Sequence, residues 1–218
     1  MSTPSKKKLC QSWRLYAITD PAAAAHNPLE VAVEKAIRGG ADVVQLRDKN
    51  LSDEEFLAMA KDLLKITRRY DVPLILNDRP YAVKASGADG LHMGQEDGSL
   101  AWARSIVGEG KIVGCSTHNH EQAEAAEKEG FDYIGVGPVF STPTKPHYEP
   151  VGLELVRFAA NNIHVPFVAI GGIDIKNVED VLKAGARTVA VVRAIMASDD
   201  PEAAAKAFAG KMGARSIG

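Results

Sequence analysis

Short apolar segments recur at regular intervals along the chain, and most are nearly continuous in Val, Ile and Leu instead of alternating with polar residues. Segments of this kind are typical of strands that are buried on both faces of a parallel sheet. The pattern predicts eight strands, at Leu15–Thr19, Val43–Arg47, Leu74–Asp78, Gly90–Gln95, Ile112–Thr117, Tyr133–Pro138, Phe167–Gly172 and Thr188–Val192.

Amphipathic stretches with helical spacing lie between these segments. The clearest follows Ser52, a good N-cap residue, with Glu55 placed three residues later to complete a capping box. Its apolar positions form one broad stripe, as in a helix that packs on a sheet. The weakest helical pattern follows Asp78. The predicted helices are Leu29–Arg38, Asp53–Tyr70, Glu121–Glu129, Leu153–Asn161, Val178–Ala184 and Pro201–Ala209.

The junctions from helix to strand carry an internal repeat. A Gly-x-Asp or Gly-x-Arg tripeptide begins at Gly40, Gly87, Gly130 and Gly185, and so precedes every second strand. Glycine at such a place suits a left-handed helix C-cap. Alternating strands and helices with this repeat favour a single (β/α)8 TIM barrel over residues 13–218, after a disordered tail over residues 1–12. An open doubly wound sheet is the alternative, because the sequence does not prove closure.

Composition narrows the class of protein. A net charge of −2 argues against general nucleic-acid binding, and no apolar run is long enough to span a membrane. The two cysteines, Cys10 and Cys115, are expected to be free thiols, and the lysine-rich start lacks the apolar core of a secretory signal. We therefore expect a cytoplasmic protein that acts on small molecules. The sequence leaves open whether it forms a homo-oligomer.

Polar residues gather where the predicted strands end, which is where barrel enzymes place their chemistry. Asp78 and Asp97 follow the third and fourth strands, and neighbouring strands are close enough for both carboxylates to reach one Mg²⁺ ion. Arg47, Lys49 and Lys145 add positive charge suited to phosphate groups.

A second anion site is predicted on the opposite side of the barrel. Gly171-Gly172 follows the seventh strand, where backbone N–H groups can approach a phosphate. The run from Gly137 to Lys145 adds hydroxyl groups, prolines and a lysine after the sixth strand. Two anion sites and a metal ion suggest an enzyme that joins two phosphorylated molecules and releases diphosphate.

The histidines and cysteines are weaker candidates. His92 lies within a strand and is expected to be packed, whereas His118 and His120 flank Asn119 at a helix start, where capping is the ordinary role. Cys115 has no obvious base beside it, so we do not expect a thiol nucleophile.

In combination, the motifs resemble the thiamine-phosphate synthase family. The resemblance covers about Leu15 to Ala194 and implies a TIM barrel that joins a hydroxymethylpyrimidine diphosphate to a thiazole or carboxythiazole ethyl phosphate. The motifs that carry it are Gln45-Leu46-Arg47-Asp48-Lys49, Asn77-Asp78-Arg79, Gly94-Gln95-Glu96-Asp97, Ser116-Thr117-His118, Gly137-Pro138-Val139-Phe140, Thr144-Lys145 and Ala169-Ile170-Gly171-Gly172-Ile173.

The resemblance also implies roles for single residues. Asp78 and Asp97 would hold one Mg²⁺ ion per active site, and Arg47, Lys49, Ser116 and Lys145 would act in catalysis. Two positions depart from the family: Arg193 stands where many relatives have Ser, and Ser141 where Pro is common. The pyrimidine diphosphate would contact Gln45, Leu46, Arg47, Asp48, Lys49, Asn77, Ser116 and Lys145, and the thiazole phosphate Thr142, Pro143, Thr144, Gly172, Val192 and Arg193.

The implied mechanism is dissociative: diphosphate leaves first, and the thiazole nitrogen captures a pyrimidine methyl cation. This route needs no protein nucleophile. A related thiazole-tautomerase isomerase is the main alternative, but it should not require the metal and diphosphate residues. A ligand-binding barrel without activity is a second alternative, and release of diphosphate on mixing both substrates with Mg²⁺ would separate the three.

Overall fold

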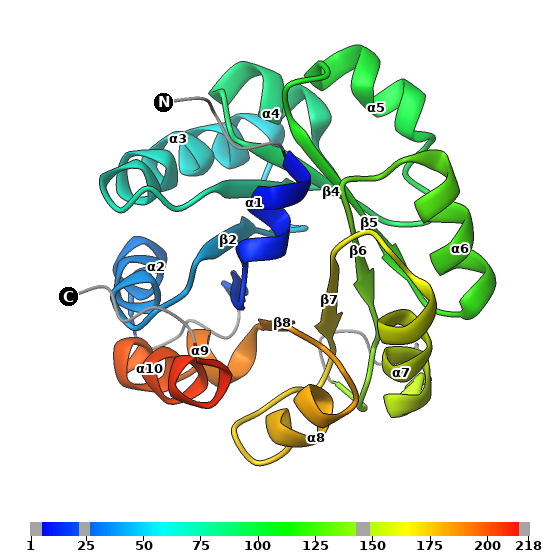
Figure 1. Ribbon diagram of the computed structural model, residues 1–218. Helices are drawn as coiled ribbons and strands as arrows, with labels where there is room; N and C mark the ends of the chain where they lie inside the picture. Colours follow the sequence, from blue (N-terminus) through cyan, green and yellow to red (C-terminus); the bar gives the residue numbers. More distant parts are fainter. Residues whose placement is uncertain (1–5, 22–26, 143–148, 214–218) are drawn as a thin grey trace.

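Eight parallel strands close into a barrel in the computed structural model, which describes residues 6–21, 27–142 and 149–213. Each strand pairs with its neighbours in chain order, and β1 pairs with β8, so the open-sheet alternative is wrong. Most of the helices surround this ring, and the first one lies across its middle (Figure 1). The strands are β1 Leu15–Ile18, β2 Val43–Leu46, β3 Leu74–Asn77, β4 Gly90–Met93, β5 Ile112–Thr117, β6 Tyr133–Val136, β7 Phe167–Ile170 and β8 Thr188–Val191.

The six predicted helices are all present, each with bounds within a few residues of those expected. The weak pattern after Asp78 is also helical, and it begins with Pro80 in the first turn. Across the described part of the chain, no helix combines the length and apolar character that a membrane span needs. The helices are α1 Lys6–Ser12, α2 Leu29–Arg38, α3 Asp53–Arg69, α4 Pro80–Ser86, α5 Leu100–Val107, α6 His120–Glu129, α7 Gly152–Asn162, α8 Val178–Lys183, α9 Arg193–Met196 and α10 Pro201–Met212.

The prediction of a disordered tail over residues 1–12 is wrong for its second half. Lys6–Ser12 forms helix α1, and Cys10 is buried in the apolar cluster that fills the barrel. Lys6 also forms a salt bridge with Asp132, at 3.3 Å. Helix α1 therefore covers the end of the barrel at which the strands begin. Its single buried residue is too weak an apolar pattern to predict a helix from sequence.

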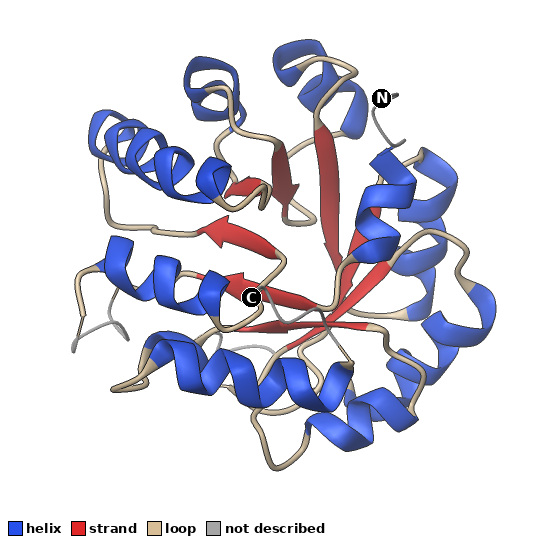
Figure 2. Ribbon diagram, turned by 60° about the vertical axis from the view of Figure 1, so that its left-hand side comes forward, coloured by secondary structure: helices blue, strands red, loops and turns tan. Residues whose placement is uncertain are grey.

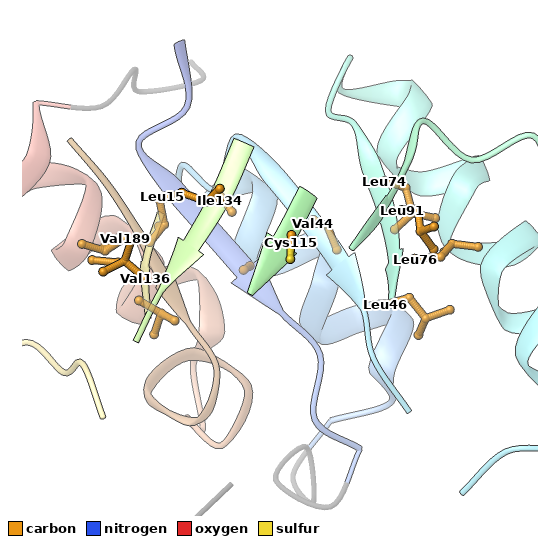
Figure 3. Packing of buried hydrophobic residues seen from close by; sticks show 14 of the residues in the cluster. Leu15, Val44, Leu46, Leu74, Leu76, Leu91, Cys115, Ile134, Val136 and Val189 are labelled. Carbon is orange, nitrogen blue, oxygen red and sulfur yellow. The ribbon is translucent and has the colours of Figure 1, made fainter. Parts of the chain in front are cut away.

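The apolar side chains form two separate cores. One lies between the strands and the surrounding helices, and Figure 3 shows its members on several strands, among them Leu46, Cys115 and Val136. The other fills the barrel itself and includes Tyr16 and Tyr133. Alternate residues of a strand point to opposite faces, so every strand except β4 supplies apolar side chains to both cores. This explains the continuous apolar segments in the sequence.

The repeated tripeptides join neighbouring strands. Asp42 accepts hydrogen bonds from the Arg14 amide at 2.9 and 3.0 Å, Asp89 accepts one from Leu74 at 2.9 Å, and Asp132 accepts one from Val113 at 2.8 Å. Each aspartate before an even-numbered strand thus holds the start of the odd-numbered strand beside it. The strands and their enclosing helices can be followed in Figure 2.

Candidate active site

A cavity of about 320 Å³ opens among the carboxyl ends of the strands. Such a volume suits a small organic ligand. Its floor is formed by aromatic side chains inside the barrel, and its rim by the polar residues that follow the strands. The lining includes Tyr16, Gln45, Arg47, Asn77, His92, Ser116, His118, Tyr133, Thr142, Gly172, Asp174, Val192 and Arg193.

Residues 45–48, at the end of β2 and after it, differ in whether their side chains face the cavity or support the surrounding structure. Gln45 is 2% exposed and lies in the barrel, and Arg47 lines the cavity. Leu46 points outward into the core between strands and helices (Figure 3), so only its backbone could contact a ligand. Asp48 accepts backbone hydrogen bonds from Asn50 at 2.8 Å and from the next residue at 3.2 Å. The carboxylate of Asp48 therefore shapes this loop.

Asp78 and Asp97 are brought into contact, with a hydrogen bond between their side chains. Burial, together with that hydrogen bond and the negative charge of Asp97, raises the pKa of Asp78 to about 6, although Lys49 acts in the opposite direction. Asp78 has a left-handed backbone, with φ of 59°, and Asp97 also accepts a hydrogen bond from the Gly94 amide at 2.6 Å. Two carboxylates in contact repel each other unless a proton or a cation lies between them.

This pair fits the ligand chemistry of Mg²⁺. The donors are oxygen atoms, and magnesium commonly takes only one or two protein carboxylates, with water and substrate phosphate completing its shell. Among the residues that the structure describes, no group of three or more His, Cys, Asp or Glu side chains could hold a metal ion by itself. The site therefore suits an ion that the substrate helps to bind.

Neighbouring residues hold the acidic pair in place. Asn77 donates a side-chain hydrogen bond to Asp78. Arg79 reaches from the end of β3 to the loop after β2, where it pairs with Asp53 at 2.7 Å and donates to the Leu51 carbonyl at 2.7 Å. Arg79 thus connects the loop that carries Arg47 and Lys49 to the one that carries Asp78.

A chain of hydrogen bonds crosses the interior of the barrel below the cavity. It runs from Gln45 through Tyr16, Tyr133 and His92 to Ser116, over four contacts of 2.9, 3.0, 2.8 and 2.9 Å. The expectation that His92 is merely packed was wrong, because its ring lines the cavity and contacts Ser116. Tyr16 and Tyr133 were missed, since in the sequence they read only as apolar strand residues.

Of the other candidates from the sequence, His120 and Cys115 have structural contacts. Asn119 caps α6 through its side chain, as expected, and His120 stacks on Phe158 with 3.8 Å between ring centroids. His118, however, lines the cavity and contacts the Gly137 carbonyl through Nδ1. Burial raises the pKa of Cys115 to about 11, and its side chain lies in the outer core. A thiolate nucleophile is therefore absent from the described part of the site.

The second predicted anion site lies where β7 and β8 end. Gly171 and Gly172 have φ of 104° and 63°, and a Cβ atom on Gly172 would lie 2.6 Å from the Ser141 carbonyl oxygen. The loop after β6 therefore packs directly on this glycine pair. Val192 and the exposed Arg193 line the same part of the cavity.

Thr142 also lines the cavity, next to this second anion site. The predicted site residues Pro143, Thr144 and Lys145 lie outside the described residues. The structure thus brings many of the predicted residues to one cavity: Gln45, Arg47, Asn77, Ser116, Thr142, Gly172, Val192 and Arg193.

Comparison with known proteins gives one consistent family. The family model described as thiamine monophosphate synthase matches residues 15–195. The chain is 43% identical to the thiamine-phosphate synthase of Halalkalibacterium halodurans, over 95% of this chain and 99% of that protein. It is 49% identical to that of Thermus thermophilus, over 80% and 84%. The solved thiamine phosphate pyrophosphorylase of Pyrococcus furiosus superposes with a TM-score of 0.86 at 35% identity, covering 94% of this chain and 98% of that one.

Proposed function

The chain belongs to the thiamine monophosphate synthase family, and we propose that it joins 4-amino-2-methyl-5-(diphosphooxymethyl)pyrimidine to a thiazole or carboxythiazole ethyl phosphate. The products would be thiamine phosphate and diphosphate, which makes the protein a transferase. The observation that carries this proposal is the contact between Asp78 and Asp97 beside the cavity, with Lys49 near enough to influence Asp78.

We assign the pyrimidine diphosphate to the side of the cavity formed by β2 to β5. Gln45 is buried inside the barrel, and Arg47, Asn77 and Ser116 line the cavity with it. Lys49 is exposed close to the acidic pair, where a diphosphate would meet both a cation and the metal site. Lys145 is proposed as a further diphosphate ligand from its motif alone.

Asp78 and Asp97 would hold one Mg²⁺ ion. When bound, the ion would neutralise charge on the diphosphate and favour its departure. The ion would also favour the ionised form of Asp78, whose pKa is raised to about 6, so metal binding and deprotonation of Asp78 are coupled. Asn77 and the Gly94 amide keep the two side chains oriented for this role.

The thiazole phosphate is assigned to the other side of the cavity. Backbone amides around Gly172 and Val192 are suited to its phosphate, and Arg193 adds a cation. The two substrates would then face each other across the cavity. Catalysis in this arrangement consists of holding the reacting carbon and nitrogen in line while Arg47 and Lys49 stabilise the leaving group.

A dissociative course suits these residues. The pyrimidine amino group supplies electron density as the carbon–oxygen bond to diphosphate breaks, and the thiazole nitrogen then forms the new bond. No protein nucleophile takes part, in accord with the raised pKa and outward position of Cys115. A thiazole tautomerase should not require metal or diphosphate residues, so that alternative does not account for the contact between Asp78 and Asp97.

We extend the proposal to the compartment in which the protein works. Cys10 and Cys115 are both buried free thiols, which suits a reducing cytoplasm. Pyrimidine and thiazole phosphates would be its partners in that compartment, and the cavity is sized for small molecules of this class.

The proposal is tested by mixing both substrates with the purified protein and following diphosphate and thiamine phosphate together. We expect equal amounts of both products with Mg²⁺, and neither product in EDTA or with one substrate omitted. Asp78→Ala and Asp97→Ala should each abolish Mg²⁺-dependent turnover while the circular dichroism spectrum is unchanged. Isomerisation of the thiazole without diphosphate release would refute the proposal in favour of the tautomerase.

A further inference from the structure

The hydrogen-bonded chain below the cavity has both of its ends at the proposed pyrimidine site. Gln45, on β2, forms one end, and Ser116, on β5, forms the other. Between them lie Tyr16, Tyr133 and His92, three residues for which the proposed reaction has so far supplied no role. The chain is thus a buried connection between two groups that would touch the same ring.

The barrel is shaped to hold this chain. A Cβ atom on Gly114 would lie 2.2 Å from the ring of Tyr133, and one on Gly135 would lie 3.4 Å from the ring of His92. The missing side chains at these two glycines on neighbouring strands therefore leave the space that the two rings occupy. Trp13 packs edge-on against Tyr133, with 5.2 Å between ring centroids, and closes the cluster from below.

The two tyrosines are suited to relay hydrogen bonds without ionising. Tyr16 and Tyr133 are 1% and 0% exposed. Burial raises the pKa of both phenols well above their ordinary value, so both hydroxyl groups keep their protons. Each hydroxyl can accept one hydrogen bond and donate another.

One direction along the chain continues from its first hydrogen bond. Gln45 donates through Nε2 to the Tyr16 hydroxyl, and in the continuing direction the Tyr16 hydroxyl donates to Tyr133. Tyr133 in turn donates to Nδ1 of His92, so the proton of a neutral His92 is on Nε2 and is donated to Oγ of Ser116. The Ser116 hydroxyl therefore keeps its hydrogen for a ligand, and Gln45 keeps its Oε1 as an acceptor.

We propose that Tyr16, Tyr133 and His92 are positioning residues that present an acceptor on Gln45 and a donor on Ser116 to the aminopyrimidine ring. This inference rests on the proposed function, which supplies the ring. An aminopyrimidine offers an N–H donor on its amino group beside a ring nitrogen that accepts, which is the complementary pattern. Positive charge grows on the amino group as diphosphate leaves, so its contact with Gln45 strengthens towards the transition state.

The first test uses the wild-type protein without substrate. Nitrogen-15 NMR of the histidine rings is recorded at pH 7.5, where an ordinary histidine is mostly neutral. The signals of His92 are assigned by their absence in a His92→Asn variant. We expect them to show a neutral ring with its proton on Nε2. A proton on Nδ1 would overturn the inference. This readout does not depend on turnover, so it also separates failure of the inference from failure of the proposed function.

The second test is kinetic and uses Tyr133→Phe, which removes the hydroxyl and keeps the ring. We expect kcat/KM for the pyrimidine diphosphate to fall roughly tenfold, while KM for the thiazole phosphate is unchanged, because one hydrogen bond that orients His92 is lost. Tyr70→Phe is the matched control, since Tyr70 donates a 2.8 Å hydrogen bond to Glu34 at the surface. It should leave the kinetics unchanged.

A double-mutant cycle shows whether Tyr133 acts through Ser116. In a Ser116→Ala background, Tyr133→Phe should have little further effect, because the hydroxyl that it orients is already absent. Additive losses would overturn the inference, as would normal kinetics in Tyr133→Phe alone. If Tyr133→Phe does not fold, Tyr16→Phe takes its place, and the tautomer of His92 still decides the question.

Discussion

The acidic pair makes a quantitative prediction about stability without metal. Asp78→Asn removes one of the two negative charges but keeps the shape of the side chain. In the folded protein the pKa of Asp78 rises from its ordinary value of 3.8 to about 6. A shift of about two units corresponds to about 3 kcal/mol. Because Asp78 is only partly buried, solvent screening reduces the expected penalty to about 1.5 kcal/mol.

The pH dependence follows from the sign of this shift. A carboxyl group with a raised folded-state pKa favours folding while it is protonated, and that contribution is lost as the pH rises from about 4 to about 6. Asparagine does not titrate. In EDTA, the free energy of unfolding of Asp78→Asn relative to wild type should therefore increase by about 1.5 kcal/mol between pH 4 and pH 8, or about 3–6 °C in Tm.

The measurement is urea unfolding followed by circular dichroism at several pH values in EDTA. The change with pH is the decisive quantity, because asparagine also suits the left-handed backbone of Asp78 and could stabilise the variant at every pH. Asp62→Asn is the control, since Asp62 is exposed and forms a surface salt bridge with Lys65 at 2.7 Å. It should show no such trend.

Magnesium should reverse the relative stability of the wild type and Asp78→Asn. With Mg²⁺ and diphosphate present, the wild type gains binding energy that Asp78→Asn has largely lost, so the wild type should become the more stable protein. A stability difference in EDTA that does not change with pH would refute the reasoning from the raised pKa of Asp78. Equal stabilisation of both proteins by Mg²⁺ and diphosphate would remove Asp78 from the metal site.

Three further variants test other parts of the structure. Arg193→Ser should raise KM for the thiazole phosphate roughly tenfold and leave the pyrimidine KM unchanged, since a charged hydrogen bond is worth about 1.5 kcal/mol at its weaker end; an unchanged thiazole KM would mean that only the backbone matters there. Gly114→Ala should cost about 1–3 kcal/mol in urea unfolding and raise the pyrimidine KM, because its methyl group would displace the Tyr133 ring; normal stability would contradict the close contact. Asp132→Ala should cost about 3–5 kcal/mol, because it leaves the largely buried Arg104 with only the exposed and more distant Glu109 carboxylate, at 3.9 Å; a loss below about 1 kcal/mol, the size of a surface salt bridge, would contradict it.

Matched changes separate these effects from general damage. Arg193→Lys keeps the charge but not the paired donors of a guanidinium group, so it should recover part of the thiazole affinity. Gly110→Ala is the control for Gly114→Ala, because a Cβ atom on Gly110 meets nothing within 4 Å. Its unfolding free energy should change little.

Much of the fold follows from local patterns in the sequence. Continuous apolar segments separated by amphipathic ones specify buried parallel strands with covering helices, and the bounds of Leu29–Arg38 and Ile112–Thr117 agree with the structure to the residue. These features depend on periodicity and capping, which act over a few residues. Helix α1 was missed because its stability depends on covering the end of a barrel that the distant strands build.

For the candidate site, too, some features follow from the sequence and others only from the tertiary structure. Asp78, Asp97 and Arg47 could be proposed as site residues from the sequence, because charged residues directly after apolar strands stand out, and Gly172 could be proposed from its place after the seventh strand. Whether Asp78 and Asp97 would touch depended on the direct pairing of β3 with β4 and on the left-handed backbone at Asp78.

Only the tertiary structure revealed the chain from Gln45 to Ser116. Tyr16 and Tyr133 are 117 residues apart and lie within apolar segments, so each looks like an ordinary core residue in the sequence. The space for their rings comes from glycines on neighbouring strands, and the direction of their hydrogen bonds depends on contacts across the barrel. The sequence thus determines which residues are apolar, charged or turn-forming, whereas the closed barrel decides which polar atoms meet inside it.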